Sequence, residues 1–373
     1  MRSKPAARPN AVKEELLDDL DTSSPDNWTR ADIDPLMSWD DELLVGSGWR
    51  PSCANFTMPR VLLVGQSHDL ELSTIARKLV NRGAFVRVLL VDQIASQPSM
   101  ELLQHEGEAS FDIGFCRAYR GDRPVHYHFD KTLRRHAEWS AVPPTEQAFA
   151  AEQLNSLFWA LMRRFEVSRW INSPWNVRDA ENKLIQLDTA IRSGVKVPQT
   201  LATSRADDVR ALAAKCSSGI IFKSLDSPIA HDPGETFKFF YTTPVDPTTL
   251  PDLKYPGLFQ ERIEPDEEFR ITVVGRRMFA ARIKRTPSNT VDWRELAPSD
   301  AAFEATVVPD SVRGSVEQIM SRLDIAVGGV DFLRVGDEFY FLEVNPSGAF
   351  LWLERTLEME ISECLTHLIL SGR

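Results

Sequence analysis

The sequence lacks the features of membrane and secreted proteins. It contains no run of about eighteen consecutive apolar residues, which is the length that a membrane-spanning helix requires. Its first ten residues are basic, but no apolar segment of the kind found in secretory signals follows them. We therefore expect a cytoplasmic protein without a membrane partner.

An excess of positive charge is also missing. The chain has 43 Lys and Arg residues against 54 Asp and Glu residues, for a formal net charge of −11. A protein that binds nucleic acid along its surface needs a basic footprint on the phosphates. The acidic balance argues against a nucleic-acid partner, although it leaves room for a local basic site that binds a smaller anion.

Several catalytic and cofactor motifs are absent as well. The four cysteines are scattered and form no CxxC, which is typical of free thiols in a reducing compartment. The seven histidines lack the spacing of a metal site on a helix. No GxGxxG follows the first predicted strand, and no local motif indicates a Ser/His/Asp or Cys/His set. Neither a dinucleotide site nor a catalytic nucleophile is predicted.

Residues 1–58 differ from the rest of the chain. Up to residue 60 there are eleven acids and seven bases, with isolated tryptophans at Trp28, Trp39 and Trp49 and only one short helical pattern, at 12–20. One interpretation is a disordered or loosely docked extension. Another is a docking segment, in which "SWDDELL" anchors on a partner or on the body of the protein. A third is a fused leader or substrate, suggested by its Asp, Glu, Ser and Thr content.

The remaining sequence predicts an α/β protein with α+β character in its C-terminal half. Apolar segments at 60–66 and 84–92 flank a helical pattern at 71–83, which indicates a parallel βαβ unit. A long helix is expected near 146–166, and another at 179–195 with Gly194 at its end. Later strands are expected at 168–174, 219–225, 238–245, 258–263, 269–275 and 277–285, followed by a hairpin at 328–346 and a helix through 350–370. We expect four units: the extension 1–58, an N-terminal unit 59–175, a central unit 176–258 and a C-terminal unit 259–373.

Three oxygen ligands are predicted to converge in the last hairpin. Glu343 and Asn345 are two residues apart on an apolar strand, so their side chains share one face. A three-residue loop at 336–338 would place Asp331 opposite Glu343. Oxygen ligands of this kind suit Mg²⁺, which would also offset the cost of burying two carboxylates. The alternative, a polar turn with solvent-facing acids, does not explain why the acids lie inside the strands.

Residues that could hold a nucleotide lie before this hairpin. Lys223 interrupts the apolar strand "GIIFKSL", where a triphosphate or a buried glutamate would satisfy its ammonium group. Lys183 begins a helix, where either an exposed lysine or a ligand is expected. Backbone groups at the end of "LFQERI" could meet adenine, and Glu268 could accept a hydrogen bond from a ribose hydroxyl. The residues at this strand end are Gln260, Glu261, Arg262 and Ile263.

Basic residues concentrate between positions 269 and 294. Arg270, Arg282 and Lys284 alternate inside strands, so some of them must face the site rather than water. Cations placed beside Mg²⁺ are what phosphoryl transfer needs, because its catalysis consists mainly of positioning and charge stabilisation. Arg276 and Arg277 follow Gly275 at a hairpin tip, where solvent-facing side chains are favoured.

These segments resemble the ATP-grasp superfamily, and within it the peptide-modifying ligases of the microviridin, or graspetide, type. The resemblance covers about residues 60–360. It is most specific in "PGLFQERIEPDEEFRITVVGRRMFAARI" with "VDWREL", and in "VGGVDFLRVGDEFYFLEVNPSGAFLWLE". It implies an ATP-grasp fold with an N-terminal βαβ domain and two α+β subdomains that sandwich ATP.

The resemblance also implies roles for individual residues. Lys183 and Lys223 would hold the ATP phosphates, and residues 260–263 with Glu268 would hold adenine and ribose. Arg270, Arg282 and Arg294 would be catalytic and would stabilise the transferring phosphoryl group or the acyl phosphate. Lys284, Asp292 and Arg294 would lie near the acceptor carboxylate. Asp331, Glu343 and Asn345 would bind Mg²⁺.

The implied reaction forms ester or amide crosslinks between side chains of a ribosomal precursor peptide. This peptide would have a leader and an acidic core with Ser or Thr.

The sequence departs from the family's pattern in two places. The loop "SLDSPIAHDPGE" after Lys223 is not clearly glycine-rich, and residues 115–125 match the family's aromatic-Arg-Arg element loosely. The rival functions are a RimK-like or glutathione-synthetase-like ligase that adds a free amino acid, and a non-catalytic peptide-binding protein. Such ligases often form homodimers, so a homodimer is also possible.

Overall fold

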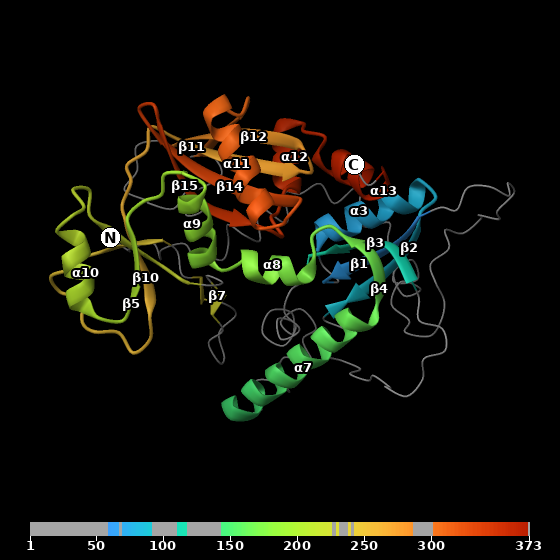
Figure 1. Ribbon diagram of the computed structural model, residues 1–373, viewed down its shortest axis with the longest axis horizontal. Helices are drawn as coiled ribbons and strands as arrows, with labels where there is room; N and C mark the ends of the chain where they lie inside the picture. Colours follow the sequence, from blue (N-terminus) through green and yellow to red (C-terminus); the bar gives the residue numbers. More distant parts are fainter. Residues whose placement is uncertain are drawn as a thin grey trace, which may run out of the picture.

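The computed structural model describes residues 59–66, 69–91, 110–117, 143–225, 229–230, 238–239, 242–285 and 301–371 (Figure 1). These residues form one parallel sheet, two antiparallel sheets and a short two-stranded ladder. The segment 1–58 and most of residues 115–125 lie outside the described residues. Among the described helices, none combines the length and the apolar character that crossing a bilayer requires.

The N-terminal sheet confirms the predicted parallel βαβ unit. Its four strands run in the order β2-β1-β3-β4, and every neighbouring pair is parallel. Alternate residues of the apolar strand β1 enter two cores, so Val61 packs with helix α3 and Leu62 packs with helix α7. The two helices therefore cover opposite faces of the sheet. The elements are β1 (Arg60–Gly65), α3 (Leu70–Asn81), β2 (Phe85–Leu90), β3 (Ser110–Cys116), α7 (Pro144–Arg164) and β4 (Glu166–Trp170).

The predicted helix at 179–195 is two helices in the structure, α8 (Pro174–Ala180) and α9 (Lys183–Arg192). Asn182 interrupts it because its side-chain oxygen accepts hydrogen bonds from the N–H groups of Leu184 and Ile185, at 3.0 and 3.3 Å. An asparagine in this position caps a new helix rather than continuing the old one. Thus Lys183 stands at the N-terminus of α9.

The central sheet has the order β5-β10-β6-β9, and its pairs are antiparallel. One face is covered by α10, where Val209 packs against Ile220 and Phe259. The predicted strand at 238–245 is divided between β8, which pairs with β7, and β9, which belongs to the central sheet. The elements are β5 (Thr200–Thr203), α10 (Ala206–Ala213), β6 (Ile220–Lys223), β7 (Ile229–Ala230), β8 (Lys238–Phe239), β9 (Thr243–Val245) and β10 (Gly257–Glu261).

The C-terminal sheet is antiparallel, with the order β13-β12-β11-β14-β15. One face packs on α9 and α11 through Ile271 and Val330, while part of the other face packs on α12 and α13 through Val274 and Ala281. Helix α11, strand β13 and the division of the last helix into α12 and α13 are not predicted from the sequence. The elements are β11 (Glu267–Val274), β12 (Arg277–Arg285), β13 (Ala301–Thr306), α11 (Asp310–Arg322), β14 (Val327–Val335), β15 (Glu338–Asn345), α12 (Leu351–Leu357) and α13 (Ile361–Ser371).

Packing links the units that the sequence divides. Helix α9 falls inside the expected central unit, yet Leu187 and Ala190 of this helix are buried in the core of the C-terminal sheet. Strand β10 spans residue 258, where the expected central and C-terminal units meet. The limits 59–175, 176–258 and 259–373 therefore stay predictions.

Candidate active site

The hairpin of β14 and β15 brings two carboxylates face to face. Asp331 is the direct cross-strand partner of Glu343, as predicted. The route to this register differs, because the turn contains two residues, Gly336 and Asp337, rather than three. Gly336 takes a positive φ of 59°, which suits a tight hairpin turn. A bulge between Asp331 and Phe332 shifts the register by one residue, so that Asp331 pairs with Glu343 despite the shorter turn.

Arg270 is bound to the same carboxylate. It lies opposite Asp331 on strand β11, and its Nη1 donates to the two Asp331 oxygens at 3.0 and 2.8 Å. The residue is 8% exposed, and its Nε finds no hydrogen-bond partner among the described residues. A buried guanidinium with a donor to spare is suited to an anionic ligand that enters beside Asp331.

Two glycines make room for the Arg270 side chain. A Cβ atom on Gly329 would lie 2.5 Å from the guanidinium carbon of Arg270. A Cβ atom on Gly348 would lie 3.3 Å from Nη2 of Arg270 and 2.9 Å from the Asn345 carbonyl oxygen. Hence the guanidinium passes directly over the backbone of β14 and of the loop that follows β15.

Asn345 completes the set of oxygen ligands. Its amide nitrogen lies 3.3 Å from an oxygen of Asp331 and 3.5 Å from an oxygen of Glu343. Exchanging the amide nitrogen and oxygen, which are interchangeable by rotation of the side chain, would turn a third oxygen toward the same point. Two carboxylates and one amide oxygen fit Mg²⁺, which takes few protein ligands and keeps sites for water and phosphate. In the described part of the chain, no cluster of three His, Cys, Asp or Glu side chains offers another metal site.

Arg282 lies on the opposite face of the sheet, so the prediction that it acts beside Arg270 is wrong. Its cross-strand partners are Phe269 and Glu304, and Phe269 points into the core under α11. Direct partners share a face of the sheet. Arg282 donates to Glu267 at 2.8 Å and to Glu304 at 2.6 Å, and these two carboxylates raise its pKa.

No protein-family model matches this sequence, and no curated protein matches it. Solved structures do match it. The macrocyclase MdnC from Microcystis aeruginosa, bound with its precursor peptide MdnA, is similar over 84% of this chain and 100% of that chain, with a TM-score of 0.65 and 19% identity. A RiPP-associated ATP-grasp ligase from Chryseobacterium gregarium, in complex with ADP and a leader and core peptide, matches over 85% and 98%, with a TM-score of 0.67 and 20% identity.

This chain has the ATP-grasp fold. A RimK domain ATP-grasp protein from Sphaerobacter thermophilus is similar over 83% of this chain and 99% of that chain, with a lower TM-score of 0.50 and 15% identity. The α/β fold class that the sequence predicts is therefore confirmed. At these identities the likeness is one of fold, so the roles of individual residues rest on the geometry of this chain.

Hydrogen bonds from the region around the start of α9 hold Lys183 near the predicted metal ligands. Ser347, two residues after Asn345, donates to Glu181 at 3.2 Å. Gln186 of α9 donates to the Val344 carbonyl at 2.7 Å and accepts from the Val344 N–H at 2.8 Å. The start of α9 is therefore fixed beside the end of β15, and a ligand role for Lys183 stays a prediction.

Lys223 and Gln260 share a face of the central sheet. Lys223 is the partner of Leu258, and Gln260 follows two residues later on β10. Because Phe259 packs under α10, this face is the one that α10 leaves open. Gln260 is 1% exposed; its amide nitrogen donates to Thr200, and its oxygen has no hydrogen-bond partner among the described residues. The predicted phosphate contact of Lys223 stays a prediction.

Hydrogen bonds of the backbone after β10 limit which N–H groups could contact adenine. The N–H of Glu261 donates to the Gln199 carbonyl at 2.8 Å, and that of Arg262 donates to the Gly219 carbonyl at 2.9 Å. Both donors are therefore engaged. Among the described residues no hydrogen bond uses the N–H of Ile263, which leaves this donor for an adenine edge. Glu268 lies two residues before Arg270, on the same face of β11.

Three predicted residues cannot be compared with this geometry. Asp292 and Arg294 lie outside the described residues. Lys284 lies in β12, and its side chain is outside the described part of the structure.

The structure adds one buried residue that sequence reasoning missed. Asn172 is 2% exposed and follows β4 of the N-terminal sheet. Its side chain donates to the carbonyls of Val327 and Pro346, at 2.6 and 3.2 Å, and accepts from the N–H groups of Ala326 and Val327. It thus joins the start of β14 to the end of β15. In the sequence, the only signal for this role is a polar residue that directly follows apolar residues in the predicted strand "SRWINSP".

Proposed function

We propose that this protein is an ATP-dependent ligase that crosslinks side chains of a ribosomally made precursor peptide. In the first step an Asp or Glu carboxylate of the peptide takes the γ-phosphoryl group of ATP, which gives an acyl phosphate and ADP. In the second step a Ser or Thr hydroxyl, or a Lys amine, of the same peptide attacks the acyl carbon. Phosphate leaves, and an ester or amide bond remains.

The convergence of Arg270, Asp331, Glu343 and Asn345 carries the proposal. Two carboxylates and an amide at one point are a donor set that suits Mg²⁺, in addition to the ion pair of Asp331 with Arg270. Bound Mg²⁺ would supply charge neutralisation at the phosphate oxygens. The likeness of fold to ligases solved with ADP and Mg and with precursor peptides supports ATP, Mg²⁺ and a peptide as the ligands here.

Within this scheme, the chain's own residues place and stabilise charge. Arg270 already lies against Asp331 with a spare donor, so it can follow negative charge that develops on the transferring phosphoryl group without moving far. Lys183, from α9, and Lys223, from β6, would approach the phosphates from two different elements. The glycines at 329 and 348 keep the Arg270 guanidinium fixed close to the backbone.

The proposal is tested with purified protein, Mg-ATP and acidic candidate peptides that contain Ser, Thr or Lys. We expect ADP release that depends on the peptide, and a product that is lighter than the peptide by one water per crosslink. The measurement is intact-mass spectrometry together with a coupled ADP assay.

A different outcome would point to one of the alternatives. A product that is heavier by an amino-acid residue would show the RimK-like reaction, to which the likeness at a TM-score of 0.50 gives some support. Absence of ADP release with every peptide, combined with peptide binding, would show a non-catalytic binding protein. The bond type and a homodimeric assembly stay predictions that the same product and a sedimentation experiment can address.

A further inference from the structure

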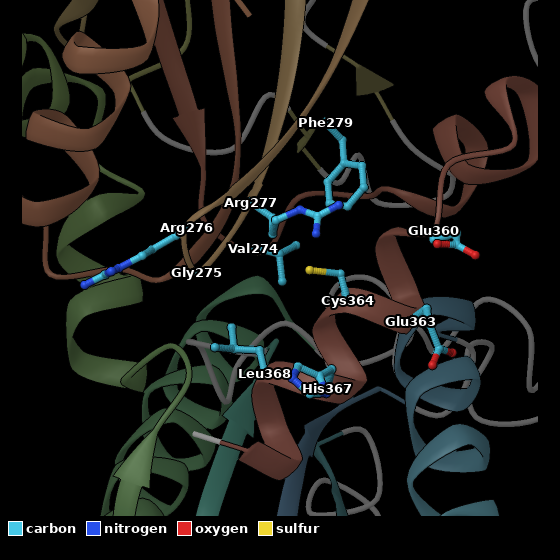
Figure 2. A pocket seen from close by; sticks show the side chains of 10 residues that line it. All are labelled: Val274, Gly275, Arg276, Arg277, Phe279, Glu360, Glu363, Cys364, His367 and Leu368. Atoms are coloured by element: carbon cyan, nitrogen blue, oxygen red, sulfur yellow. The ribbon is translucent and has the colours of Figure 1, made fainter. Parts of the chain in front are cut away.

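A recess lies between the β11–β12 turn and α13, and none of its lining residues belongs to the proposed metal site (Figure 2). It is a groove of about 720 Å³. Val274 and Leu368 form part of its floor and are 2% and 8% exposed, and the ring of Phe279 lines one wall. We call this recess the α13 groove.

The charged side chains around the α13 groove are unevenly distributed. Arg276 and Arg277, from the turn, are exposed at one edge. Across the groove, Glu363 is held by Lys78 of α3 at 3.4 Å and by Arg82, which directly follows α3, so its charge is offset. Glu360 is the remaining acid of the lining, and His367 lies beside Leu368 (Figure 2). The edge at the turn is therefore cationic above an apolar floor, which suits a ligand that is both acidic and apolar.

The described chain begins close to this groove. The N–H of Phe85 donates to the carbonyl of Pro59 at 3.1 Å, which fixes Pro59 beside the start of β2. Arg82, three residues before Phe85, is bound to Glu363 in the groove lining. Pro59 thus lies within roughly 20 Å of the groove, given about 3.3 Å per residue and one arginine side chain. Residues 1–58 reach the body of the protein next to the α13 groove.

One part of residues 1–58 has the matching chemistry. Residues 31–45 contain five acidic side chains and no basic one. Within them, "SWDDELL" places Trp39 directly before Asp40 and Asp41, and two leucines follow. Twenty residues separate Trp39 from Pro59, enough chain to span about 60 Å when extended. The length is therefore sufficient for this segment to return to the groove.

We propose that residues 38–44 of this same chain dock in the α13 groove. The indole of Trp39 packs on Val274, Phe279 and Leu368, and the carboxylates that follow it face the guanidinium groups at the β11–β12 turn. An aromatic anchor surrounded by charge pairs is the usual composition of a binding hot spot. The inference stands on the groove and on the start of the described chain, so it holds or fails independently of the proposed ligase activity.

The Cys364 thiol provides a direct test, because it points into the groove (Figure 2). Cys116 and Cys216 are buried, so a Cys53→Ser background leaves Cys364 as the accessible thiol of the chain. Burial raises the pKa of the Cys364 thiol, with Arg277 acting in the opposite direction, so labelling with a maleimide is measured at mildly alkaline pH. We expect Trp39→Ala to raise the labelling rate of the full-length protein about tenfold, because it removes the apolar anchor.

Trp28→Ala is the matched control, since Trp28 lies outside the acidic stretch 31–45, and it should leave the labelling rate unchanged. Arg277→Glu should also raise the rate. Adding Asp40→Arg and Asp41→Arg to Arg277→Glu should lower the labelling rate again, because opposite charges then face each other. The single and the triple variant both carry glutamate at position 277, next to the Cys364 thiol. Their difference therefore reports docking rather than a change in thiol reactivity.

Equal rates for Trp39→Ala and Trp28→Ala would overturn the proposal. Protection of Cys364 that grows with protein concentration would assign the groove to a second copy of the chain. Protection that requires an added precursor peptide would assign it to the substrate. Either of these results would replace residues 38–44 as the occupant.

Discussion

The two faces of the C-terminal sheet use the same residue type in different ways. On one face, Arg270 is buried against Asp331, beside Glu343 and Asn345, with its Nε unpartnered among the described residues. On the other face, Arg282 is shared between Glu267 and Glu304 and is about a third exposed. The Nε of both arginines lacks a hydrogen-bond partner among the described residues, so they differ in burial and in the number of carboxylates that bind them. The contrast teaches that an arginine is suited to catalysis when it is buried beside a single carboxylate, since a guanidinium with two carboxylates has little charge left to offer.

The largest expected effect comes from the proposed metal ligands on the Arg270 face. Glu343→Gln keeps the shape of the side chain but removes a negative charge from the Mg²⁺ donor set. We expect peptide-dependent ADP formation to fall on the order of a thousandfold, which exceeds the 10- to 100-fold typical of residues that only support a ligand. The assay is repeated over a range of Mg²⁺ concentrations. A rate within tenfold of the wild type at saturating Mg²⁺ would remove Glu343 from the proposed site.

The comparison itself is tested by making the same change on both faces. Arg270→Lys loses the planar guanidinium group, whose Nη1 contacts both Asp331 oxygens, and we expect kcat to fall about 100-fold. Arg282→Lys should change kcat by less than about threefold and lower the free energy of unfolding by about 1 kcal/mol or less, because its ion pairs are partly exposed. Steady-state kinetics and denaturant unfolding of both variants decide the point. A reversed order would show that the face assignment is mistaken.

A smaller effect is expected from the glycine that Arg270 covers. The Cβ atom of Gly329→Ala would lie 2.5 Å from the guanidinium group, so the flexible end of Arg270 must move away from Asp331. We expect kcat to fall about tenfold, because the guanidinium group of Arg270 would be displaced but not lost. Combining Gly329→Ala with Arg270→Lys should cost little more than Arg270→Lys alone. If the losses of kcat in Gly329→Ala and Arg270→Lys were strictly additive, Gly329→Ala would not act by displacing Arg270.

The smallest effect is expected on the helix that covers the other face. Gly314 lies inside α11, and a Cβ atom there meets nothing within 4 Å. Gly314→Ala should raise the free energy of unfolding by about 0.5–1 kcal/mol, because alanine favours the helix more than glycine does. Thermal unfolding measures the gain, and kcat should stay unchanged. A loss of activity in this variant would show that α11 communicates with the site.

Much of the site could be predicted from strand periodicity, because side chains alternate between faces in every strand. Asp331, Glu343 and Asn345 follow this rule, and the structure brings them together. The same rule could have separated Arg270 from Arg282. The β11–β12 turn pairs Val274 with Arg277, which places Ala281 rather than Arg282 opposite Arg270. The turn around Gly275 was the available signal.

Long-range contacts could not be predicted, because nothing local specifies them. Asn172 and Gln186 hold β14 and β15 from sequence distances of about 155 residues. Their side chains satisfy backbone groups whose position depends on the complete fold. The division of 179–195 into two helices had a local cause in Asn182, a good capping residue, which the apolar spacing of the segment concealed.

The bulge in the last hairpin decides which face of the sheet Glu343 occupies. The observed two-residue turn with a bulge and the predicted three-residue turn without one both pair Asp331 with Glu343. They differ only nearer the tip, where the observed register buries Phe341 rather than Leu342 in the core. A two-residue turn without the bulge would pair Asp331 with Leu342 instead and would turn Glu343 to the other face of the sheet. The single extra residue in β15 therefore allows a tight turn, a buried Phe341 and the carboxylate pair to exist in one hairpin.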